Sequence, residues 1–139
     1  MAFMSQERKA EIAPAVKTIL NRYGLNGSLS VRDHSTLILT IRSGEIDFIT
    51  NYRDAIMADR GRIEPWQMTD HIEVNHYHVA REFTGEACEA ITALVAAMNN
   101  GNWDKSDVMT DYFNVGWYID IKIGTWSKAY EYELAGVMA

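Results

Sequence analysis

The sequence has little cysteine and no long apolar stretch, and both shortages exclude whole classes of protein. Its one cysteine, Cys88, cannot form an internal disulfide framework or supply a zinc site built on several thiolates. The longest fully apolar run, residues 93–98, is far shorter than the roughly 20 residues of a membrane-spanning helix. The first ten residues lack the apolar core of a signal peptide. We therefore expect a cytoplasmic protein with no membrane segment.

Motifs of nucleotide binding and of hydrolysis are also missing. The chain contains no P-loop, no GxGxxG fingerprint and no GxSxG elbow. Cys88 lies on the apolar face of an expected helix, where a free cysteine usually behaves as a small hydrophobic residue. We therefore expect neither enzyme activity nor a cofactor. Paired carboxylates distant in sequence stay open as an acid–base alternative.

Basic charge is scarce in one half only. Residues 1–70 carry nine Lys and Arg against nine Asp and Glu, whereas residues 71–139 carry four against ten, which accounts for the net charge of −6. Because proteins grip phosphate backbones with clustered basic side chains, the second half is unsuited to nucleic acid. An acidic half suits a basic protein partner, or it serves solubility alone.

The patterning that is present predicts one domain over residues 1–139, because no repeat or linker interrupts it. Helical spacing of apolar residues follows Ser5, Ser43-Gly44 and Thr84, and Pro14 is expected either to kink the first helix or to make residues 11–13 its frayed beginning. Strand-like runs cover residues 29–32, 36–42, 71–79 and 115–123, the first two joined as a hairpin. The order α-β-β-α-β-α-β predicts an α+β fold, with about three helices on one face of a mostly antiparallel four-stranded sheet.

Three histidines, His71, His76 and His78, fall close together. On a strand, His76 and His78 would share a face and could meet one metal ion, but His71 has the opposite parity. Ile72 and Val74 share the parity of His76 and His78, so a sheet face running from core to rim also explains the pattern. Neither HExxH nor a supporting carboxylate motif accompanies them, and we expect no metal site.

Acidic and aromatic residues gather toward the end of the chain. Asp104, Asp107 and Asp111 would share one face of a helix but lack the pattern of a calcium loop, and a turn capped by Asp107 is the simpler alternative. Eight of the 15 aromatic residues lie between residues 103 and 132. Tyr118 is expected on the outer face of the last strand, with Trp126 after it. Exposed amphipathic rings are typical anchors of protein interfaces, although a small aromatic core is the alternative.

Three stretches of the chain resemble a known family: DKSDVMTDYFNVGWYIDIKIG at residues 104–124, LSVRDHSTLILTI at residues 29–41 and VNHYH at residues 74–78. They are similar to small proteins carried by phages and other mobile elements, whose domain also occurs within the large polyvalent proteins of such elements. The resemblance implies an accessory role directed at host machinery, including defence systems. It brings no functional residues with it, because the shared pattern has no assigned active site.

Two functions of different classes follow. The first is a non-catalytic inhibitor that binds a host protein or defence complex, in an anti-CRISPR-like role. Its expected contacts are Asp104, Asp107, Asp111, Tyr118 and Trp126. The alternative is a nucleic-acid-binding module that uses arginines of the first half. These are Arg32, Arg42, Arg53, Arg60 and Arg62. The aromatic residues are also compatible with a homodimer.

Overall fold

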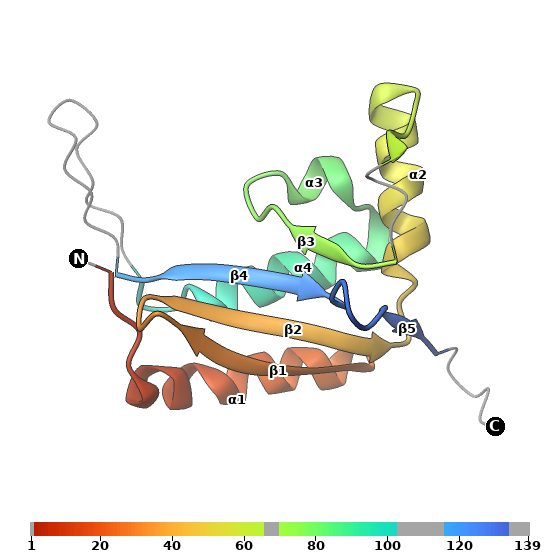
Figure 1. Ribbon diagram of the computed structural model, residues 1–139. Helices are drawn as coiled ribbons and strands as arrows, with labels where there is room; N and C mark the ends of the chain where they lie inside the picture. The colour runs from red at the N-terminus through yellow and green to blue at the C-terminus, as the bar shows by residue number, and fades with distance from the viewer. Residues whose placement is uncertain (1, 66–69, 103–115, 134–139) are drawn as a thin grey trace, which may run out of the picture.

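The chain folds into a mixed β-sheet with helices packed against it (Figure 1). The computed structural model describes residues 2–65, 70–102 and 116–133. Within these residues it contains four helices and five strands. The helices are α1 (Gln6–Arg22), α2 (Phe48–Arg60), α3 (Val79–Glu82) and α4 (Gly85–Met98). The strands are β1 (Leu25–Arg32), β2 (Thr36–Gly44), β3 (Ile72–Val74), β4 (Tyr118–Ile123) and β5 (Glu131–Tyr132). The expected α+β class is confirmed.

The sheet differs from the expected one in the direction of its strands. Its order is β1-β2-β4-β3, and β5 pairs with the end of β2. The β1–β2 and β3–β4 pairs are antiparallel, whereas β4 and β5 both run parallel to β2. The prediction of a mostly antiparallel sheet of four strands is therefore wrong. A parallel pair needs a long crossover, and here α2, β3, α3 and α4 all lie between β2 and β4 in the chain.

α1 is one continuous helix that is capped at its beginning and contains a proline. The Ser5 hydroxyl accepts a hydrogen bond from the Arg8 amide at 3.0 Å, which caps the free N–H groups of the first turn. Pro14 lies inside α1, which begins at Gln6, so residues 11–13 are not its frayed beginning, as one of the two expectations held. The buried residues Ile12, Val16 and Leu20 lie on one face of this helix. That face packs on β1 and α4.

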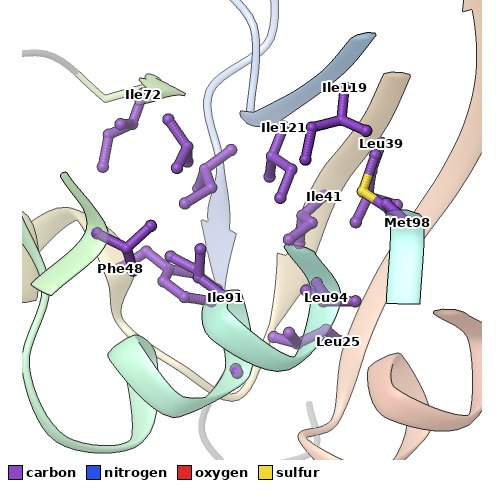
Figure 2. Close-up of a cluster of buried hydrophobic side chains, with 14 of the residues drawn as sticks. Leu25, Leu39, Ile41, Phe48, Ile72, Ile91, Leu94, Met98, Ile119 and Ile121 are labelled. Carbon is purple, nitrogen blue, oxygen red and sulfur yellow. The ribbon is translucent and has the colours of Figure 1, made fainter. Parts of the chain in front are cut away.

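The hydrophobic core lies between the sheet and the pair α1 and α4. Leu39 and Ile41 of β2 and Ile121 of β4 are almost fully buried, and they meet Ile91 and Leu94 of α4 (Figure 2). Where α2 begins, at Phe48, aromatic rings continue this core. They are Phe48, Tyr52, Phe83 and Tyr130, which pack at centroid distances of 5.5 to 6.2 Å.

The third expected strand is much shorter than predicted. β3 ends at Val74 because Asn75 turns the chain: its side-chain oxygen accepts from the Tyr77 amide at 3.1 Å and its carbonyl accepts from the His78 amide at 2.9 Å. His76 and His78 therefore lie beyond the strand, and His78 precedes α3. The expectation that both project from one strand face is corrected.

The beginning of β4 is fixed by a buried tryptophan. The Trp117 indole N–H donates to the Met98 carbonyl at 3.0 Å, which ties the strand to the end of α4. The Asn102 side chain accepts from the Trp117 amide at 3.1 Å and donates to the Trp117 carbonyl at 2.9 Å. The strand begins one residue later, at Tyr118. The first residue of the expected strand, Val115, lies outside the described residues.

Two glycines with similar backbone angles should respond differently to alanine. Gly124 and Gly61 have φ angles of +67° and +74°, so a side chain at either position costs about 1–2 kcal/mol. A Cβ at Gly124 would lie 2.5 Å from the Tyr130 amide nitrogen, whereas one at Gly61 meets no atom within 4 Å. We expect Gly124→Ala to lower the free energy of unfolding by about 3 kcal/mol or more and Gly61→Ala by about 1 kcal/mol, as measured by urea denaturation. Equal losses would show that β4 and the segment before β5 are not in close contact.

Candidate protein-binding surface

A tight turn after β4 presents the most exposed large apolar side chain in the described residues. Thr125 and Lys128 pair through their backbones, the Thr125 amide donating to the Lys128 carbonyl at 2.8 Å and the Lys128 amide to the Thr125 carbonyl at 3.1 Å. The Thr125 hydroxyl also accepts from the Lys128 amide. Trp126 lies at the tip of this turn with 86% of its surface exposed. The turn therefore holds a tryptophan in solvent on a short hydrogen-bonded loop.

The backbone on both sides of this turn is anchored to the core. Before it, Ile123 is fully buried in β4. After it, the Tyr130 hydroxyl donates to the Ile46 carbonyl at 2.7 Å, and the Tyr130 amide donates to the Asp70 carbonyl at 3.0 Å. Burial, with the nearby carboxylate of Asp47 as a second cause, raises the pKa of Tyr130, so its hydroxyl keeps the proton that it donates. Residues 125–128 thus project from two fixed points, and we name them the Trp126 turn.

Tyr118, the other aromatic contact expected from the sequence, lies at the opposite end of β4. It is 50% exposed and pairs in register with Thr36 of β2. The six residues of β4 span about 17 Å, so Tyr118 and the Trp126 turn do not form one cluster. Asp104, Asp107 and Asp111 lie outside the described residues.

The sheet face opposite α1 and α4 is largely polar, and we name it the open face. Its polar side chains alternate with the core residues of β1, β2 and β4. They are Ser28, Ser30, Arg32, Thr40, Asp120 and Lys122, and the buried Thr36 and Ile38 of β2 lie on the same face. Arg32 reaches across β2 toward β4, where its Nη1 lies 3.7 Å from Oδ2 of Asp120. Tyr118 has the same parity in β4 as Asp120, so it lies on this face, two positions from the acidic member of the pair.

The arginines expected for nucleic acid are spread over several elements. Arg32 and Arg42 lie on β1 and β2, Arg53 and Arg60 on α2, and Arg62 follows α2. Carboxylates accompany three of them. Asp120 pairs with Arg32, Glu64 lies 2.9 Å from Arg62, and Glu82 interacts electrostatically with Arg60. Arg42 instead donates to the Ser28 hydroxyl at 2.7 Å, at the edge of the sheet.

The histidines each find a separate environment. His71 Nδ1 lies 3.3 Å from Asp70 Oδ1, and the His76 ring stacks near Tyr77 with centroids 4.1 Å apart. Among residues 2–65, 70–102 and 116–133, no group of three or more His, Cys, Asp or Glu side chains is arranged to hold a metal ion. Cys88 is half-buried on α4, its sulfur 4.0 Å from the Thr92 hydroxyl.

Sequence reasoning missed two features that matter here. It did not find the Trp126 turn, although Gly124 followed by polar Thr125, Ser127 and Lys128 is a turn composition. It also gave no structural role to Tyr130, whose contact with Ile46 joins residues 84 positions apart. A pattern read along the chain does not reveal a partner at that distance.

Comparison with known proteins identified no relatives. No family model, no curated protein and no solved structure matches the chain. In the part of the chain that the structure describes, no helix is long and apolar enough to cross a membrane.

His76 should make stability depend on pH. Its partial burial lowers its pKa below the ordinary value of 6.5, opposed by the attraction of Asp120. The unfolded chain therefore binds more protons just below this value, and the stabilising contribution is lost as the pH falls through that range. We expect wild-type protein to lose more stability between pH 7 and pH 5 than the His76→Gln variant, as measured by urea denaturation. The control is the His34→Gln variant, which alters a histidine in the exposed β1–β2 turn. Equal losses of stability in wild type and His76→Gln would show that His76 is not the source of the pH dependence.

Proposed function

We propose that this chain is a non-catalytic protein that binds another protein, with the Trp126 turn as its principal anchor. The observation that carries the proposal is a tryptophan that is 86% exposed on a turn anchored at both sides. Leaving so large an apolar surface in water forgoes a substantial stabilising contribution to folding. Tryptophan is also among the residue types enriched at the positions that dominate binding energy.

The rigidity of the turn supports binding more strongly than exposure alone. Isolated exposed apolar residues are ordinary on protein surfaces. The Trp126 turn differs because its backbone hydrogen bonds and the buried Tyr130 fix its conformation before any partner arrives. A preformed anchor loses less conformational entropy on binding than a flexible one.

Charge supports a basic partner. The whole chain has a net charge of −6, and all of this excess lies in residues 71–139, which include the Trp126 turn. Opposite charge on a partner would speed association at low salt. We propose a host protein or defence complex as the partner and an anti-defence, anti-CRISPR-like role as the outcome. This finer identification rests on the resemblance to phage and mobile-element proteins.

The test is an affinity pull-down from bacterial lysate with three proteins: wild type, Trp126→Ala and Tyr77→Ala. Tyr77 is a matched control because it is an aromatic residue with 82% exposure in the turn after β3. We expect wild type and Tyr77→Ala to retain one stoichiometric protein after nuclease treatment. Trp126→Ala should weaken its affinity by about 2 kcal/mol, close to 30-fold in Kd, in calorimetry with the purified partner.

Other results would overturn the proposal. A partner retained equally by wild type and Trp126→Ala would remove the turn from the interface. Loss of every partner after nuclease treatment would favour nucleic acid, with Arg32, Arg42 and Arg53 the first residues to reverse in charge. If the protein chemically altered its partner or the partner's substrate, a purely binding role would be excluded.

A further inference from the structure

α1 and β1 lie side by side (Figure 1), and a cleft is lined by residues of α1, β1 and β2. Its volume is about 820 Å³. From α1 the lining includes Ala10, Ala13 and Pro14, and from the sheet it includes Leu29. We name this cleft the α1–β1 groove. It shares no lining residue with the Trp126 turn.

The backbone along one side of the groove belongs to a free sheet edge. β1 is the first strand in the order β1-β2-β4-β3, and no strand of residues 2–65, 70–102 and 116–133 pairs with its outer side. An edge strand directs the N–H and C=O groups of alternate residues away from its neighbour, where they can pair with an added strand. The eight residues of β1 span about 24 Å, enough for an extended segment of similar length.

The apolar layer beneath the sheet is incomplete at this edge. Leu37 and Leu39 of β2 are fully buried, whereas their register partners on β1, Val31 and Leu29, are only half-buried. The helix side of the groove carries small side chains at Ala10 and Ala13, which leaves room for the side chains of another strand. An added strand with apolar residues on its inner face would therefore extend the core.

The charges around the groove are of one sign. Lys9 and Lys17 line it from α1, Arg42 lines it from β2, and none of its described lining residues is acidic. Arg42 is held at the edge by its 2.7 Å hydrogen bond to the Ser28 hydroxyl of β1. This local positive charge stands out in a chain with a net charge of −6. Acidic side chains on an incoming segment would be attracted to it.

From these observations we propose that the α1–β1 groove binds an extended acidic segment of a partner protein, which adds to β1 as a further strand. Main-chain hydrogen bonds to the β1 edge supply affinity. On the side that faces α1, apolar residues of the segment meet the apolar lining and acidic residues meet Lys9 and Lys17, whereas acidic residues on its other side meet Arg42, which is bonded to Ser28 of the open face. A second copy of this chain is a poor occupant. Two β1 edges brought together would place the same three cations of each copy near one another.

The inference goes beyond the proposed function, because it concerns a different surface and a partner of opposite charge. Its probe is a displayed library of random decapeptides, selected on wild-type protein and counter-selected on the double variant Lys9→Glu/Lys17→Glu. Both lysines are surface residues of a capped helix, so the variant should fold, and its melting temperature verifies this. Lys128→Glu, a single reversal of the same kind within the Trp126 turn, is the control for a charge change outside the groove.

We expect enriched peptides that combine apolar and acidic residues. In fluorescence anisotropy their Kd should rise about tenfold for Lys9→Glu/Lys17→Glu, as the loss of two surface charge contacts implies, and stay unchanged for Lys128→Glu and Trp126→Ala. Amide exchange of β1 should slow when the peptide binds, because the edge N–H groups gain partners.

Four results would each overturn the inference. They are no enrichment over the counter-selection, enriched peptides without acidic residues, equal affinity for wild type and the double variant, and unchanged exchange in β1. A concentration-dependent dimer in ultracentrifugation that the double variant abolishes would identify the occupant as a second copy and overturn it as well. Since Trp126→Ala leaves the groove intact, failure here and failure of the proposed function are distinguishable.

Discussion

The parallel pairing of β2 with β4 is the constraint on which the rest of the structure depends. Leu37, Leu39 and Ile41 lie in register with Ile119, Ile121 and Ile123, so six aliphatic side chains form two adjacent rows on one face. α4 packs on these rows, and β1 and β3 extend them on either side (Figure 2). Burial of such rows is the dominant favourable contribution in folding. The same pairing directs β4 toward the end of the sheet where the Trp126 turn and β5 lie.

Local patterns predicted the elements that depend on neighbours in sequence. Helical spacing after Ser5 and Thr84 identified α1 and α4, and the hairpin between β1 and β2 was expected where Asp33 and His34 adopt φ angles of 53° and 57°. Strand direction was beyond reach because the alternation in residues 117–123 is the same for parallel and antiparallel pairing. β3 was overextended because the parity of His76 and His78 continues past the turn at Asn75.

The candidate sites show the same division. Trp126 was singled out from its residue type as a partner contact, which stays a prediction, and the structure leaves its side chain exposed. Its anchoring could not be predicted, because it depends on Tyr130 reaching Ile46 and Asp70. The α1–β1 groove was not anticipated either, since Lys9, Lys17 and Arg42 are far apart in sequence and only the edge position of β1 brings them together. The two surfaces differ in chemistry. The Trp126 turn presents one aromatic side chain in the acidic half of the sequence, whereas the α1–β1 groove is an apolar cleft lined by basic residues.

The hydrogen bond from Tyr130 to Ile46 also bears on the order in which parts of the fold form. It closes a loop of 84 positions and therefore depends on the crossover between β2 and β4 being in place. During synthesis, β1, β2 and α2 leave the ribosome long before Tyr130 does. The Trp126 turn thus acquires its fixed geometry among the last parts of the fold, when the core beneath it already exists. Until Tyr130 has been synthesised, the Trp126 turn lacks the contact that anchors its C-terminal side to Ile46.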